Sequence, residues 1–199
     1  MLLRPYPRGM TMHGMTDEPT PERWTQGTVY ADMWVDPDDD PREKIQAPND
    51  ERGVVLAYLR RYRMTLEMKC ADLDAEQLAR RSVPPSTMSL LGLVRHLTAV
   101  EHNWFRRVMG RQDVPRLYPH DEDFEGAVAD PEVIARAWRD WRAEVAFADE
   151  YLATEPDLGT LGAGDIPLRD VLVHLVEEYA RHCGHADFLR ERIDGRVGQ

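Results

Sequence analysis

From residue 51 onward, apolar side chains recur every three or four positions, which is the spacing of one face of an α-helix. In the first such segment, about residues 51–71, the apolar stripe is Val55, Leu59, Tyr62 and Leu66. Four segments carry this pattern, and none shows the apolar–polar alternation that is typical of half-buried strands. Amphipathic helices bury their apolar faces by packing together, so the pattern predicts an all-α fold, a four-helix bundle.

Capping residues mark the ends of the other three predicted helices. The second begins at Ser89, a favourable N-cap, and ends at Gly110. The third follows the Asp130–Pro131 pair, because Asp is a favourable cap and Pro is favoured in the first turn. The fourth opens near Pro167 and ends before Gly195. Their apolar stripes are, in order, Leu93, Leu97, Val100, Trp104 and Val108; Ile134, Trp138, Trp141, Val145 and Leu152; and Leu168, Leu172, Leu175, Tyr179, His182, Ala186, Leu189 and Ile193.

The N-terminal quarter of the chain has no helical or strand period and is rich in proline. We therefore divide the chain into an irregular arm, residues 1–50, and a helical domain, residues 51–199. Trp24, Tyr30 and Trp34 are large apolar groups in this otherwise polar arm. We expect part of the arm to pack on the domain, or on a second subunit in a homodimer.

Charge and composition exclude several classes of partner. The formal net charge of −11 disfavours binding to nucleic acid or to anionic membranes. There is no apolar run of the length that spans a bilayer, and the first residues lack the apolar core of a signal peptide. Cys70 and Cys183 are too few for a disulfide framework, so we expect a cytoplasmic location and interpret both as small apolar core residues.

Polar residues interrupt the apolar stripe of the fourth predicted helix. Glu178 and His182 are four residues apart, so both lie on one helical face, where one metal ion could bridge them. His96 of the second predicted helix faces inward beside Leu93 and Leu97 and is the best third ligand. Two imidazoles and a carboxylate suit zinc, and also nickel and iron(II). They leave coordination positions open, where bound water or a thiol is acidified and becomes a nucleophile.

A structural interpretation of these residues stays open beside the metal site. A single histidine on an apolar face is commonly a core residue satisfied by a hydrogen bond, and Glu178 could pair with Arg95 or Arg181. His185 lies one turn after His182 and is the candidate catalytic residue, as a proton shuttle or an orienting group. The other candidates receive structural interpretations: His174 as a core or rim residue, His102 and His120 as surface residues, and Glu177 and Asp187 as solvated or ion-paired residues.

Two of these segments, Ser89–Leu97 and Glu178–Glu191, resemble the DinB-like superfamily of four-helix metal proteins. The nearest branch is an actinobacterial one, often called mini-circle or DinB-family proteins, which Pro84–Ser86 and Trp104–Arg106 also fit. The resemblance covers about residues 51–199. It implies an up-down four-helix bundle with a long crossover between helices two and three.

In this superfamily three inward side chains usually hold a divalent metal. The similar mycothiol-dependent maleylpyruvate isomerase uses His, Glu and His, which implies the ligands His96, Glu178 and His182 here; His185 stands where many relatives have Gln. The resemblance therefore implies a divalent-metal-dependent enzyme, a thiol S-transferase or isomerase that activates a thiol such as mycothiol toward a small-molecule electrophile. Two alternatives stay open: a metal-dependent hydrolase that uses bound water, and a non-catalytic stress-response or binding protein with a vestigial metal pocket.

Overall fold

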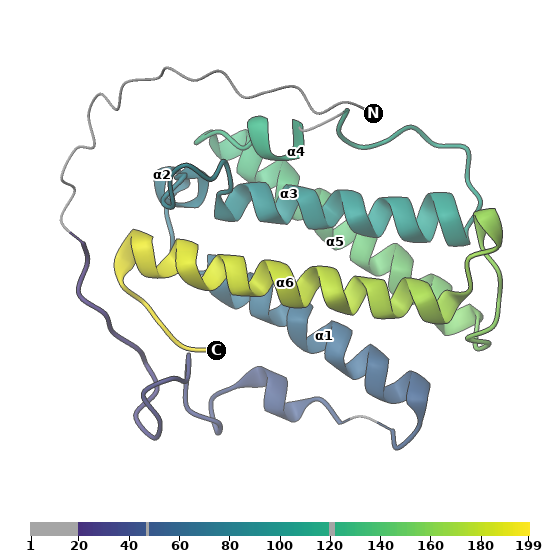
Figure 1. Ribbon diagram of the computed structural model, residues 1–199, viewed down its shortest axis with the longest axis horizontal. Coiled ribbons are helices and arrows are strands. Elements are labelled where there is room, and N and C mark those ends of the chain that lie inside the picture. The colour runs from purple at the N-terminus through teal and green to yellow at the C-terminus, as the bar shows by residue number, and fades with distance from the viewer. Residues whose placement is uncertain (1–19, 47, 120–121) are drawn as a thin grey trace.

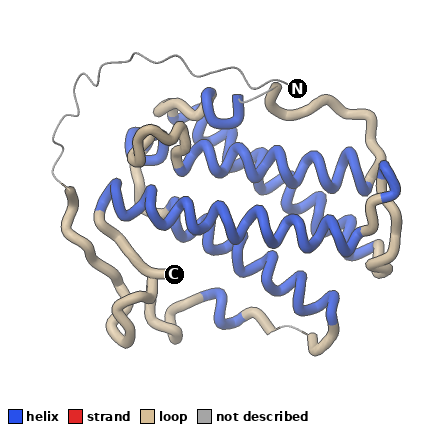
Figure 2. Tube along the Cα trace, viewed as in Figure 1, coloured by secondary structure: helices blue, strands red, loops and turns tan. Residues whose placement is uncertain are grey.

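The computed structural model describes residues 20–46, 48–119 and 122–199, and within these ranges its regular secondary structure consists of helices without strands. Four long helices lie side by side and form the body of the molecule (Figures 1 and 2). The predicted all-α class is therefore confirmed, while the up-down order with a long crossover stays a prediction. The long helices are α1 (Glu51–Cys70), α3 (Leu90–Glu101), α5 (Pro131–Thr154) and α6 (Leu168–Asp194); the short ones are η1 (Pro41–Lys44), α2 (Ala75–Ala79), α4 (Glu122–Glu125) and η3 (Ala163–Asp165).

Side-chain caps fix where the long helices begin. The Ser89 hydroxyl accepts a hydrogen bond from the backbone N–H of Gly92, and the Asp130 carboxylate accepts one from the N–H of Glu132. At the other end of α6, Gly195 has a φ of 80°, a left-handed conformation that glycine adopts without steric cost. These three predicted helix ends are confirmed.

The core forms where the apolar faces of the four long helices meet. Helix α1 packs mainly on α6, and α3 packs on both α5 and α6. Residues of the predicted stripes, among them Leu59, Leu66, Leu93, Leu97 and Leu175, are almost completely buried. Throughout the described part of the chain, we find no helix with the length and apolar character that crossing a membrane requires.

The second predicted helix is not a single α-helix. After α3 the chain continues as η2, a π-helix over His102–Met109, in which each turn holds more residues than an α-turn. The extra residue per turn rotates the side chains, so the structure buries Phe105 and Met109 at 0% and 5% exposure. Trp104 and Val108, which the sequence places in the buried stripe, are only partly buried. That part of the prediction is wrong because the stripe was counted with the α-helical period.

The prediction for His102 is also wrong, because the loop after η2 covers this residue. The sequence places this residue on the surface, but it is buried, and its Nε2–H donates a hydrogen bond to the carbonyl oxygen of Pro115 at 3.0 Å. His102 therefore attaches the loop after η2 to the helix. His120 lies outside the described residues.

One buried polar network joins the four long helices. The guanidinium of Arg63 on α1 forms a bidentate ion pair with Glu101 of α3, with both N–O distances at 2.8 Å. The hydroxyl of Tyr179 on α6 donates to Glu101 at 2.9 Å and accepts the indole N–H of Trp141 on α5 at 2.9 Å. Burial raises the pKa of Glu101, and its pairing with Arg63 opposes that rise.

Part of the N-terminal arm packs on the domain, as expected. Trp34 is 2% exposed, and its ring contacts three cations, with Arg196 Cζ at 3.7 Å and Lys69 Nζ at 4.0 Å from the ring centroid and Arg190 beside them. Trp24 pairs through its backbone with the segment after α6 but leaves its side chain exposed. The division of the chain at residue 50 stays a prediction, and so does the homodimer.

The buried network predicts large stability losses for substitutions within it. Glu101→Ala would leave the buried Arg63 guanidinium with only the half-exposed Asp149 as a carboxylate partner, so we expect a loss of about 3 kcal/mol in the free energy of unfolding. Tyr179→Phe would remove one partner each from Trp141 and Glu101, for a loss of about 1–3 kcal/mol. Urea denaturation measures both. Arg181→Ala on the surface is the control and should change stability by less than about 0.5 kcal/mol; equal effects for all three variants would contradict the prediction.

Candidate metal centre

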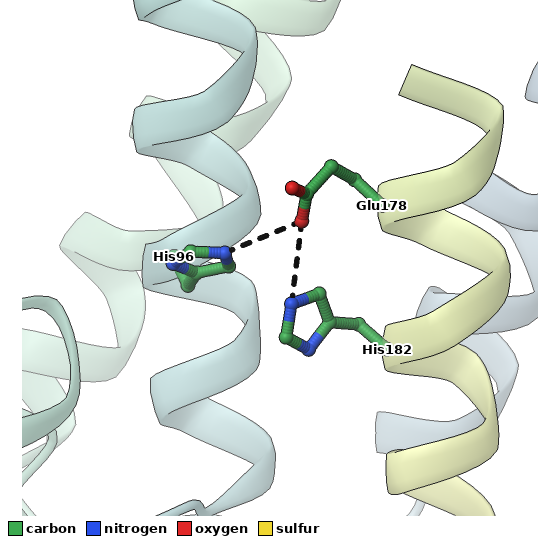
Figure 3. Close-up of side chains that lie close together, drawn as sticks. All are labelled: His96, Glu178 and His182. Atoms are coloured by element: carbon green, nitrogen blue, oxygen red, sulfur yellow. Dashed lines mark ion pairs between the residues drawn. The ribbon is translucent and has the colours of Figure 1, made fainter. Parts of the chain in front are cut away.

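The structure brings His96, Glu178 and His182 together between α3 and α6 (Figure 3). The Oε2 atom of Glu178 lies 3.6 Å from His96 Nε2 and 3.4 Å from His182 Nε2. The three candidate ligand atoms all lie within 4.8 Å of one another. Glu178 and His182 share a face because they are one helical turn apart on α6, and His96 approaches from the opposite helix.

A carboxylate from a third element orients His96. Asp123 of α4 accepts a hydrogen bond from His96 Nδ1–H at 2.8 Å. This bond places a ring proton on Nδ1, so Nε2, which faces Glu178, is the nitrogen that a metal ion could bind in place of a proton. Metal-binding histidines commonly donate their other ring N–H to a carboxylate in this way.

His185 contacts His182 on the ring nitrogen that does not face Glu178. The two Nδ1 atoms are 3.2 Å apart, so one of them donates a hydrogen bond to the other. When Nε2 of His182 acts as a ligand, its Nδ1 carries the ring proton. The Nδ1–H group then donates the hydrogen bond, and Nδ1 of His185 accepts that bond. The structure therefore places His185 behind a candidate ligand.

The two histidines of the centre have opposite pKa shifts. Burial alone would lower the pKa of His96, but its hydrogen bond to Asp123 and the charges of Asp123 and Glu178 raise it above its ordinary value. Burial lowers the pKa of His182 to about 4, and the nearby positive charges of His96, His185 and Arg181 add to the effect. Neutral imidazole is the form that binds metal, so the low pKa of His182 favours binding, whereas the raised pKa of His96 means that protons compete more strongly with the ion at that ring.

The ion pairs that the sequence left open for Glu178 do not form. The guanidinium of Arg95 turns away and donates to the carbonyl oxygens of Glu122 and Asp123. Arg181 forms a surface ion pair with Glu177 instead, as predicted for Glu177. No arginine of the described chain neutralises Glu178, which leaves its carboxylate for the histidines around it.

A cleft of about 460 Å³ opens beside His96 and Glu178. Its walls include Trp104 and Asn103, which η2 turns toward the cleft, together with Arg116 from the following loop. The side-chain oxygen of Asn103 accepts a hydrogen bond from Arg107, which leaves the amide N–H groups for other partners. The cleft is large enough for a small molecule and lies directly against the candidate metal ligands.

Two residues of the centre were not assigned to it from the sequence. Asp123 follows a long loop whose path periodicity does not predict, so no spacing rule relates it to His96. His174 was interpreted as a core or rim residue that could also extend the polar line before Glu178; it is partly buried at the wall of the cleft, and its Nε2 lies 3.4 Å from Glu178 Oε1. Its position one turn before Glu178 was the available signal.

The donor set fits a divalent ion. With metal–ligand bonds of about 2.0–2.1 Å, ligand atoms of a tetrahedral zinc site are roughly 3.3 Å apart, close to the 3.4 and 3.6 Å from Glu178 to the two histidines; the two histidine nitrogens lie within 4.8 Å of each other. The carboxylate behind His96 is a typical hydrogen-bond partner of a metal-binding histidine, and the imidazole of His185 occupies the corresponding place behind His182. Three protein ligands leave positions for a thiol, a substrate or water.

A helical bundle with His, Glu and His facing one another beside an open cleft defines a class, the four-helix metal-binding proteins. The family model of mycothiol-S-transferase matches residues 54–195, and the chain belongs to that family. The predicted DinB-like relationship is thereby confirmed. At family level, membership indicates a metal-dependent, mycothiol-related S-transferase function. Searches of curated proteins and of solved structures give no significant match.

The pKa of His182 predicts a pH dependence of stability in metal-free protein. Its folded pKa of about 4 lies below the unfolded value of about 6.5, so the unfolded state binds more protons between these pH values. This contribution to the free energy of unfolding is complete above pH of about 6.5 and is lost as the pH falls toward 4. We expect His182→Gln to flatten part of the acid-side loss, measured by urea denaturation in chelator.

His96 contributes to the free energy of unfolding with the opposite pH dependence, because its pKa in the folded state is raised. Its contribution is present below about pH 6.5 and is lost as the pH rises through the folded pKa. NMR titration of the two imidazoles separates these contributions. The same midpoint for both rings would show that the electrostatic description is wrong.

Proposed function

We propose that this protein is a metal-dependent thiol S-transferase that joins a low-molecular-weight thiol, such as mycothiol, to a small electrophile. The observation that carries the proposal is the His96, Glu178 and His182 cluster beside the cleft, in a chain of the mycothiol-S-transferase family. We propose zinc as the ion, with nickel and iron(II) as alternatives that accept the same ligands. An isomerase that uses the same thiolate chemistry remains within this proposal.

The chain's own residues prepare the centre for a thiol. A divalent ion held by His96, Glu178 and His182 would lower the pKa of a thiol bound beside it, so that the thiolate is available at neutral pH. Asp123 keeps the Nδ1 proton of His96 in place and so leaves Nε2 free to bind. The cleft offers a surface for the parts of the thiol and the electrophile that do not react.

We propose that His185 acts as an orienting residue. Its contact with His182 Nδ1 supports a role in holding that ring, since the proton between the two nitrogens fixes which face of His182 binds metal. The alternative role as proton shuttle predicts that His185→Gln slows turnover without changing metal content. The orienting role predicts that metal affinity falls as well.

Metal content and thiol-dependent turnover test the proposal together. Tag-free protein should hold about one divalent ion per chain by elemental mass spectrometry, and Glu178→Gln and His182→Gln should lose it while keeping their helical circular dichroism. Turnover of mycothiol with an electrophilic probe such as monobromobimane should fall at least about 100-fold in both variants, because the thiolate is no longer stabilised. Glu177→Gln, one residue away but on the surface, is the matched control and should behave as wild type.

Other outcomes select the alternatives. Turnover of an ester or amide probe without added thiol would identify a metal-dependent hydrolase. The absence of bound metal after reconstitution with zinc, with a thermal midpoint that neither zinc nor chelator shifts, would favour a non-catalytic binding protein. The cytoplasmic location stays a prediction.

A further inference from the structure

Arg95 directly precedes His96 on α3, yet its side chain is directed at the segment of α4. The residue is 8% exposed, and its Nε and Nη2 donate to the carbonyl oxygens of Asp123 and Glu122, both at 2.8 Å. Its guanidinium also lies over the ring of Tyr118, 4.1 Å from the centroid. One buried side chain therefore contacts both the loop before α4 and α4 itself.

The α4 segment in turn contacts His96 on two sides. Asp123 Oδ2 accepts the hydrogen bond of His96 Nδ1–H at 2.8 Å, and its other oxygen accepts one from the backbone N–H of Phe124 at 3.0 Å. The Phe124 ring stacks on the imidazole, with the two centroids 5.2 Å apart and the planes at 25°. The position of α4 thus determines both the plane of the imidazole and the nitrogen that carries its proton.

Two glycines allow α4 to approach this closely. A Cβ atom on Gly126 would lie 2.5 Å from Arg95 Nη2, and one on Gly92 would lie 2.9 Å from Phe124 Cδ1. Both distances are shorter than packed carbon atoms tolerate, so a larger residue at either position would displace Arg95 or α4. The absence of side chains at Gly92 and Gly126 therefore leaves the room that Phe124 and the Arg95 guanidinium occupy.

We propose that Arg95 is a positioning residue of the metal centre, which docks α4 on α3 so that Asp123 and Phe124 hold His96 with Nε2 toward Glu178. Arginine suits this task because its rigid fork of donors reaches two carbonyl oxygens at once and remains charged when buried. The inference rests on the proposed function, since it concerns a ligand of the same ion. Outer-shell partners of metal ligands change metal affinity about 10–100-fold, which sets the expected size of the effect.

Zinc affinity in matched arginine variants tests the inference. We expect Arg95→Gln to raise the Kd for zinc, measured by competition with a chromophoric chelator, by about 10-fold or more. Arg181→Gln is the control, because Arg181 directly precedes the other histidine, His182, but forms its ion pair on the surface. Its Kd should stay within about two-fold of wild type. Wild-type affinity in folded Arg95→Gln would overturn the inference.

A second variant covers the case in which Arg95→Gln does not fold. Gly126→Ala keeps the arginine at position 95, but the added methyl group would displace its guanidinium. This variant should therefore also weaken zinc binding. Combining Arg95→Gln with Asp123→Asn should weaken binding by less than the sum of the two single effects, because part of the effect of Arg95 passes through the Asp123 hydrogen bond to His96. A merely structural Arg95 would lower the melting temperature and leave the zinc Kd of Gly126→Ala and of the other folded variants unchanged.

NMR of the metal-free protein separates this inference from the proposed function. In wild type, Nδ1 of His96 should carry the proton and show a hydrogen bond to Asp123, and in Arg95→Gln or Gly126→Ala this signature should be lost. If wild type binds no zinc, the proposed function fails, and the NMR result alone decides the role of Arg95. An unchanged His96 signature in both variants would refute that role.

Discussion

A single buried carboxylate constrains the packing of the whole bundle. Glu101 on α3 is fully buried and accepts hydrogen bonds from Arg63 of α1 and Tyr179 of α6, and the tyrosine is held in turn by Trp141 of α5. An unpaired charge in this place would be very costly, so the helices must adopt the rotations that complete the network. Glu178 immediately precedes Tyr179. The rotation of α6 that sends the tyrosine into the core therefore sets the direction in which Glu178 leaves the helix.

The candidate metal centre lies at the edge of this core, and its electrostatics follow from that position. His96 lies between two carboxylates, Asp123 and Glu178, which together favour a positive charge there. His182 lies deeper, against His96 and His185, and its pKa is lowered because burial disfavours the charged ring and the neighbouring positive charges add to this effect. Negative charge from Asp123 and Glu178 is thus concentrated around the two nitrogens of His96, and no arginine among the described residues pairs with either carboxylate. A divalent cation satisfies this arrangement better than a single proton does, which is the electrostatic argument for a metal.

The helices and the pairing of Glu178 with His182 could be predicted because both follow from local rules, whereas His96 was chosen from its place beside the apolar stripe of another helix and from the family resemblance. Glu178 and His182 share a face through helical spacing alone, and caps such as Ser89 mark helix ends independently of tertiary structure. Asp123 could not be predicted, because its approach to His96 depends on packing of α4 by a side chain from another helix. The orientation of the residues after α3 was also missed, since a hydrophobic pattern does not reveal a change from the α to the π helical period.

The π-helix connects a small change in chain length to the chemistry of the cleft. Within η2, the winding turns Asn103 and Trp104 into the cleft wall, while Phe105 and Met109 occupy the core. A relative with one residue fewer in this segment can wind as an ordinary α-helix and keep the same core contacts further along the chain. Its cleft would then present different side chains to the ligand although the bundle is unchanged. A single-residue deletion in this segment would therefore change which substrates the cleft accepts. Sequence alignments guided only by the apolar stripes would pair residues that face different environments in the two proteins.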